Sequence, residues 1–274
     1  MPRKKRDRRP SRVALAAARR LRTWMRQIDA DLFARAEALA LRRDMVTLLT
    51  YVRDNRITGT QSTGNLPLKA VRAVTARFVH PPKLESTVGD HTYRLRSEAD
   101  VWPLYFLHAL ADVGGLVDWG PARRWRLTPD GALFLGASPP IQVWILFAFW
   151  WERINWLIAY PPEGMGEDLP PRFRRITRTH LLSLPVDKRV LFEPFADELI
   201  QETGLKWTAP DMSSAKMLLQ GAIRRMVVKI LADFEVVEPE YQARPLGKGT
   251  VRELVAFRIT PFGRGLLESV EPID

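Results

Sequence analysis

The sequence predicts a mainly α-helical protein with short β-hairpins, in which one α+β unit occurs twice in tandem. The clearer copy runs from Asp211 to Leu267. Apolar residues recur at three- and four-residue spacing from Ala215 to Phe234, which predicts an amphipathic helix. Two short strands follow, and Thr260-Pro261 then begins a short helix, because threonine caps a helix and proline fits its first turn. This order of elements is that of the second half of a winged helix-turn-helix domain.

The same pattern occurs earlier in the chain. Leu110–Val117 resembles Leu231–Glu238, and Arg126–Gly131 resembles Arg258–Gly263. The second pair is spaced more widely than the first, and the extra residues fall between the two strands, as a longer wing would require. Chance similarity of two amphipathic hairpins is the alternative. Because the order and type of the elements match, we predict two tandem winged helix-turn-helix units.

Charge is concentrated at one end of the chain. The 274 residues carry a formal net charge of +11 and include no cysteine. Residues 1–26 hold eleven Lys or Arg and one Asp, whereas the remainder holds 31 basic and 30 acidic side chains. The absence of cysteine excludes disulfides, zinc–cysteine sites and thiol chemistry, and it fits a reducing cytoplasm.

Residues 1–12 are expected to form a disordered basic arm, because they have almost nothing to bury. Such an arm attracts polyanions with salt-sensitive affinity, and DNA or RNA is the expected partner. An anionic lipid surface and a role in solubility are the alternatives. No apolar core follows the basic residues, so no signal peptide is expected. The candidate phosphate contacts in the arm are Arg3, Lys4, Lys5, Arg6, Arg8 and Arg9.

Residues 13–43 are expected to form an N-terminal helical segment, and residues 44–160 form what we call the first unit. Its predicted elements are three helices and a hairpin, over 44–55, 66–78, 97–113 and 116–128. Pro81-Pro82 ends the second of these helices.

The first unit ends in an aromatic stretch from Pro139 to Tyr160. Its uninterrupted apolar run, Val143 to Trp151, has nine residues, too few to span a bilayer. We expect a buried helix that holds the two units together; an exposed aromatic platform is the alternative. Residues 161–178, rich in proline, are expected to be a linker. Residues 179–274 form the second unit, which begins with a helix over 184–205 that Gly204 ends.

Part of the first unit resembles a known family. The resemblance rests on Leu107–Val117, Trp125–Gly131, Leu135, Pro139–Trp144 and Trp150. These residues resemble helicase-associated winged-helix modules, which accompany bacterial superfamily-two DNA translocases and occur in related stand-alone uncharacterised bacterial proteins. The resemblance covers residues 44–160, with a fainter echo in the C-terminal third. It implies a winged-helix fold, a DNA-associated setting and no catalysis.

Motifs for catalysis or cofactor binding are missing from the sequence. It holds no phosphate-binding Gly-x-x-x-x-Gly-Lys-Ser/Thr run, no nucleophile elbow and no paired carboxylates in a pattern typical of acid–base chemistry. Its histidines, His80, His91, His108 and His180, show no metal-ligand spacing. We therefore predict no enzyme activity, no metal and no cofactor, and we interpret His108 as a core histidine with its hydrogen bonds satisfied.

The two units differ in charge. Residues 97–135 of the first hold three basic and five acidic side chains, whereas residues 212–267 of the second hold nine and five. A DNA-reading helix needs a cationic face, so the second unit and the arm are expected to contact duplex DNA. The candidate contacts in the second unit are Lys216, Gln220, Arg224, Arg225 and Lys229 on the helix, and Arg244, Lys248 and Arg252 on the wing. Secondary candidates are Lys69, Arg72, Arg172, Arg174 and Arg175.

These observations predict a cytoplasmic, nucleoid-associated DNA-binding protein without catalytic activity: a regulator, a nucleoid factor or a mobile-element or defence-associated factor. The alternative is an adaptor that uses winged helices to bind a helicase, another ATPase or an assembly component, with the first unit as the protein-binding part. No membrane partner is expected.

Overall fold

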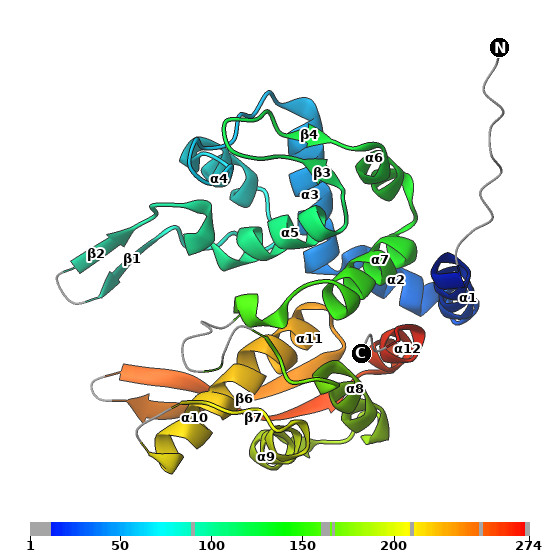
Figure 1. The fold of residues 1–274 in the computed structure, drawn as a ribbon, viewed down its shortest axis with the longest axis vertical. Coiled ribbons are helices and arrows are strands. Elements are labelled where there is room, and N and C mark those ends of the chain that lie inside the picture. Colours follow the sequence, from blue (N-terminus) through cyan, green and yellow to red (C-terminus); the bar gives the residue numbers. More distant parts are fainter. Residues whose placement is uncertain are drawn as a thin grey trace.

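The computed structural model describes residues 12–88, 91–159, 165, 168–208, 211–246 and 249–271. Helices make up most of it, and the strands form small antiparallel sheets (Figure 1). The prediction of a mainly α-helical protein with short β-hairpins is therefore confirmed.

The first unit contains α3 (Ala40–Asp54), α4 (Leu68–Thr75), α5 (Trp102–Val113), β3 (Val117–Asp118), β4 (Arg126–Leu127) and α6 (Pro129–Gly136). Thr58, between α3 and α4, forms an antiparallel bridge with Arg124 beside β4. The helix predicted to start at Asp44 begins four residues earlier, at Ala40. Asp44 is instead almost buried, and its Oδ1 atom accepts a hydrogen bond from the Val79 amide.

A hairpin that the sequence analysis did not predict separates α4 from α5. It consists of β1 (Glu85–Val88) and β2 (His91–Arg94), and it projects from the first unit (Figure 1). The short 3-10 helix η1 (Glu98–Asp100) leads from it into α5. The second and third helices of this unit are therefore not joined by a tight turn.

The aromatic helix α7 (Pro139–Glu152) lies between the two units, with Phe147, Trp150 and Trp151 fully buried. The ring centroids of Phe147 and Trp150 lie 5.2 and 5.8 Å from that of Phe234 in the second unit. The prediction of a buried helix that holds the units together is confirmed. No helix in the described part of the chain is long and apolar enough to cross a membrane.

The second unit contains α8 (Phe173–Ser183), β5 (Val190–Leu191), α9 (Phe192–Thr203), α10 (Met212–Ile223), η3 (Arg224–Lys229), α11 (Ile230–Asp233), β6 (Val237–Leu246), β7 (Gly249–Ile259) and α12 (Pro261–Ser269). Its sheet is antiparallel in the order β5-β7-β6. Residues 173–178, expected in the linker, belong to α8. The helix expected over 184–205 begins only at Phe192, because 190–191 pair with β7, and Gly204 ends it at a φ of 67°.

The long helix expected from Ala215 to Phe234 is interrupted. Residues Arg224–Lys229 form the π-helical turn η3 between α10 and α11. A π turn holds more residues than an α turn, so it rotates the side chains after it relative to those before it. The face defined by α10 therefore does not continue unchanged into α11.

Matching hydrogen bonds relate the two units. The Leu116 amide donates to the Ala111 carbonyl, and the Val236 amide donates to the Leu231 carbonyl, both at 2.8 Å. The residues before these amides, Gly115 and Glu235, both have a positive φ, of 62° and 54°. Leu116 is thus equivalent to Val236. The sequence comparison aligns Leu116 with Val237, so its alignment of the helix ends is wrong by one residue.

The helix starts after the hairpins also match. Thr128 Oγ1 accepts from the Gly131 amide at 3.0 Å, and Thr260 Oγ1 accepts from the Gly263 amide at 2.8 Å. A Cβ atom on Gly131 would lie 2.2 Å from the Leu116 carbonyl oxygen. One on Gly263 would lie 2.1 Å from that of Val236. The repeated Thr-Pro-x-Gly sequence is therefore a cap followed by a close helix–strand approach that only glycine permits.

The N-terminal helical segment packs against α7 and against the last described helix, α12. α1 (Arg12–Arg26) and α2 (Ala30–Ala38) precede α3, and α1 lies beside α12 (Figure 1). The buried Trp24 donates its Nε1 hydrogen to the Pro140 carbonyl at 3.1 Å and packs edge-on against Phe262. Arg20 Nη1 lies 3.0 Å from Glu152 Oε1.

Candidate nucleic-acid interface

The candidate residues of the basic arm, Arg3, Lys4, Lys5, Arg6, Arg8 and Arg9, lie outside the described residues, as does Lys248. Their role as phosphate contacts stays a prediction. The first described helix, α1, begins at Arg12.

The β6–β7 hairpin, the candidate wing, has a basic outer half and an acidic base. Residues 241–254 contain three basic side chains and one acidic one, Glu253, whereas Glu238 and Glu240 lie nearer the base. Glu240 is held there by Arg189, whose Nε lies 2.8 Å from its Oε2 atom. The hairpin therefore presents net positive charge only toward its tip.

Arg244 and Arg252 project from opposite faces of this hairpin. Arg244 is opposite Val251, and Arg252 is opposite Ala243, the next pair along the ladder. Adjacent pairs in an antiparallel ladder point to opposite faces. Accordingly Arg244 Nη1 lies 3.3 Å from Glu253 on one face, and the Arg252 guanidinium lies 4.9 Å from the Tyr241 ring centroid on the other. The tip thus offers positive charge in two directions.

Two of the predicted base-reading residues on α10 are bound to α9. Lys216 Nζ lies 2.8 Å from Asp197 Oδ2, and Gln220 Nε2 donates to Asp197 Oδ1 at 2.8 Å. Burial opposes ionisation of Asp197, but the hydrogen bonds from Lys216 and Gln220 outweigh it and lower the pKa of this carboxyl. The row that was expected to face a DNA groove is therefore partly neutralised by a carboxylate of its own chain.

The remaining helix candidates occupy different surroundings. Lys229 Nζ lies 2.8 Å from Asp233 Oδ2, and both side chains line a cavity shared with the first unit. Arg224 is half-buried and Arg225 is exposed, within the π-helical turn. The face that packs on the aromatic helix is the apolar one, through Phe234.

The secondary candidates for DNA contact also lie in different surroundings. Lys69 is exposed on α4, and Arg72 lies 3.8 Å from Glu85 of the inserted hairpin. Arg172 is exposed at the start of α8, and Arg175 is half-buried in that helix's first turn.

Arg174 has an interior role rather than the solvent-facing phosphate contact expected of it. Its guanidinium donates to the carbonyls of Glu152 and Ile154 and lies over the Trp156 ring. Burial lowers its pKa. Arg174 therefore ties α8 to the end of the aromatic helix, a role that sequence reasoning missed because it depends on contacts about 20 positions away.

One buried pair contains groups used in catalysis elsewhere. His108 Nδ1 lies 2.6 Å from Glu98 Oε1, and Glu98 Oε2 accepts from the Leu66 amide at 2.6 Å. His108 Nε2 is buried without a hydrogen-bond partner, so the prediction of a fully satisfied histidine is only half right. The rings of Trp119 and Trp125 pack against the imidazole. Among the described residues no group of three or more His, Asp or Glu side chains could hold a metal ion.

Comparison with known proteins adds no relative: no protein-family model matches this chain, and no curated protein and no solved structure matches it. The resemblance to helicase-associated winged-helix modules therefore stays a prediction.

Proposed function

We propose that this chain is a duplex-DNA-binding protein without catalytic activity, built on two tandem winged helix-turn-helix units. The support for the fold is the order helix, strand, helix, helix, strand, strand in the second unit. Its third strand lies between the other two, in the order β5-β7-β6. The hydrogen bonds shared by the ends of α5 and α11 support a first unit of the same kind.

The observation that carries DNA binding is the charge distribution on the β6–β7 hairpin. Its outer half carries net positive charge, with Glu253 the one acidic residue there, and Arg244 and Arg252 lie on opposite faces. A hairpin charged on both faces suits a groove whose two walls are both lined by phosphates, because each arginine can reach a different strand. The basic arm would add further phosphate contacts, each releasing a condensed counterion.

Base reading has weaker support than phosphate binding. Lys216 and Gln220 would have to leave Asp197 before they could contact a base edge. Breaking such charge-assisted hydrogen bonds costs about as much as a good base contact provides. We therefore propose that binding is governed by phosphates and depends only slightly on sequence.

A salt titration tests this proposal. Affinities for short labelled duplex DNA, single-stranded DNA and RNA are measured by fluorescence anisotropy between about 50 and 200 mM salt. The expected result is preference for duplex DNA and a slope of log K against log salt near −0.9 for each phosphate neutralised. Absence of duplex binding at the lowest salt concentration would refute the proposal.

An adaptor function is the second candidate, and one observation favours it. Met212 and Met217 are 88% and 66% exposed on α10. Exposed methionines are typical of protein-binding surfaces, because their flexible side chains adapt to apolar partners. If duplex binding fails, replacing both by glutamine tests the adaptor directly: recovery of a partner from the source lysate should be lost in the double variant and retained by the unaltered protein.

A further inference from the structure

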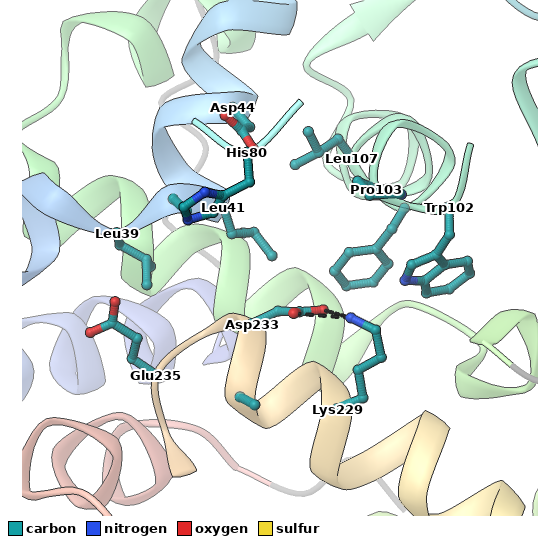
Figure 2. Close-up of a pocket in the computed structure, with 13 residues that line it drawn as sticks. Leu39, Leu41, Asp44, His80, Trp102, Pro103, Leu107, Lys229, Asp233 and Glu235 are labelled. Atoms are coloured by element: carbon teal, nitrogen blue, oxygen red, sulfur yellow. Dashed lines mark hydrogen bonds and ion pairs between the residues drawn. The ribbon is translucent and has the colours of Figure 1, made fainter. Parts of the chain in front are cut away.

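A cavity of about 350 Å³ lies where the first and second units meet. Residues of α3, α5 and the segment after α4 line one side, and α11 with its neighbouring residues lines the other (Figure 2). Its volume falls within the roughly 300–1,000 Å³ usual for small-molecule sites.

The walls of this cavity are largely apolar. Leu39 and Leu41 contribute from the start of α3, and Leu107 from α5. The rings of Trp102 and Phe106, also on α5, are stacked with centroids 5.5 Å apart and an angle of 18° between their planes. Apolar and aromatic walls favour a ligand with an apolar, preferably flat, body.

The charged groups of the cavity are mostly acidic. The lining contains three carboxylates, Asp44, Asp233 and Glu235, and a single lysine, Lys229, with His80 beside Asp44 (Figure 2). Lys229 is already bound to Asp233, with 2.8 Å between Nζ and Oδ2. Glu235 forms no ion pair with any described residue. Burial raises the pKa of Asp44, against the hydrogen bond from the Val79 amide and the charges of His80 and Arg43.

We propose that this cavity binds a small organic cation: an amine with a flat apolar body. The body packs against Trp102 and Phe106, and the ammonium group is drawn to the acidic side chains of the lining, of which Glu235 has no ion-pair partner among the described residues. Glu235 is also half-buried, so solvent screens its attraction for a cation less than at a fully exposed carboxylate. The aromatic rings add attraction for the same charge.

Occupation of the cavity has a structural consequence. The ligand contacts both units, so it stabilises the arrangement in which they face each other and raises the thermal midpoint by mass action. Ligand binding by this cavity does not depend on DNA binding, because it involves only the residues that line the cavity and is measured directly with the ligand.

Tryptamine is the test probe, and indole-3-propionate is the matched control, with the same ring system and the opposite charge. Binding to the full chain is measured by isothermal titration calorimetry and by the shift in thermal midpoint. We expect tryptamine to bind and raise the midpoint, and indole-3-propionate to do neither. Equal binding of the two compounds, or no binding by either tryptamine or phenethylamine at millimolar concentration, would overturn the proposal.

Two conservative variants locate the binding. Glu235→Gln and Asp44→Asn remove negative charge from the cavity while keeping size, and the asparagine oxygen can still accept from the Val79 amide. Each should weaken tryptamine binding about tenfold or more, the usual effect of losing a charge-assisted contact. Glu238→Gln, on the exposed base of the β6–β7 hairpin, is the control and should bind as the unaltered protein does. Unchanged affinity in both cavity variants would overturn the proposal.

Discussion

His108 Nδ1 lies 2.6 Å from Glu98 Oε1, and both side chains are almost completely removed from solvent. Because Glu98 also accepts the Leu66 amide just before α4, one carboxylate joins α5 to the start of α4 across the inserted hairpin. This pair stabilises the first unit at the place where its second and third helices are not joined by a short turn.

Glu98→Ala should destabilise the protein by about 2–4 kcal/mol, because it leaves the Leu66 amide and His108 buried without a partner. The free energy of unfolding from urea denaturation measures the effect. Glu238→Ala removes an exposed glutamate and should change stability by less than about 0.5 kcal/mol. Equal stability of the two variants would show that the Glu98–His108 pair contributes nothing.

Arg244→Ala and Arg252→Ala should each weaken duplex binding without changing sequence preference, and each should reduce the salt slope by about 1. Because the two side chains lie on opposite faces of the hairpin, their effects should add. Lys248→Ala is expected to behave in the same way. Arg258→Ala, at the base of the same hairpin, serves as the control and should bind normally. Loss of affinity in the Arg258 variant alone would exclude contact by the tip.

Removal of residues 1–11 keeps all described residues of α1, Arg12–Arg26. The thermal midpoint should therefore stay nearly unchanged while duplex affinity falls and its salt dependence flattens. Calorimetry measures the thermal midpoint of the shortened protein, and fluorescence anisotropy measures its affinity for duplex DNA. Undiminished affinity at moderate salt would mean that the arm takes no part in binding.

The contacts of Asp197 allow a test of α10. Asp197→Asn removes the negative charge that neutralises Lys216, so duplex affinity should rise if this helix approaches DNA. Arg224→Ala and Arg225→Ala should fold normally and lose affinity under the same hypothesis. If all three variants bind as the unaltered protein does, α10 and η3 do not contact DNA and binding depends on the hairpin and the arm.

Asp44 predicts a pH effect on stability. Burial raises its pKa, against the opposing hydrogen bond from the Val79 amide and the charge of His80. The folded protein therefore holds this proton more tightly than the unfolded chain. The stability that it contributes is complete below the ordinary Asp pKa of about 3.9 and is lost as pH rises through the folded value.

At neutral pH, Asp44→Asn should consequently match or exceed the unaltered protein in thermal midpoint, and the gain should disappear in acid. Midpoints measured across the acidic range provide the check. The thermal midpoint of the variant is compared with that of the unaltered protein at each pH. If this difference is less favourable to the variant at neutral pH than in acid, the predicted direction of the pH effect is wrong.

Local sequence signals predicted part of the fold. Thr128 and Thr260 cap their helices, Gly204 ends α9 in the left-handed region, and the apolar run of α7 is buried. Each of these depends on a side chain and its immediate neighbours, so the residue types alone were sufficient.

Features that depend on distant contacts were missed. Asp197 is 19 residues from Lys216, and no local pattern indicates that it takes both Lys216 and Gln220. The π turn at Arg224–Lys229 contains no glycine or proline that would indicate an interruption of the helix. The β1–β2 hairpin lacks a clear alternation of apolar residues, because its strands project from the body rather than cover a core. For the candidate interface, the sequence shows which residues are basic. Only the structure shows which of these residues form ion pairs with acidic residues of the same chain.

The contact between Trp24 and Phe262 joins the first described helix to the last. During synthesis α1 emerges long before α12, so Trp24 lacks its contact with Phe262 until that residue has been made. Closing so long a stretch of chain makes folding slow, and it couples the unfolding of one unit to that of the other. We expect one cooperative unfolding transition rather than two.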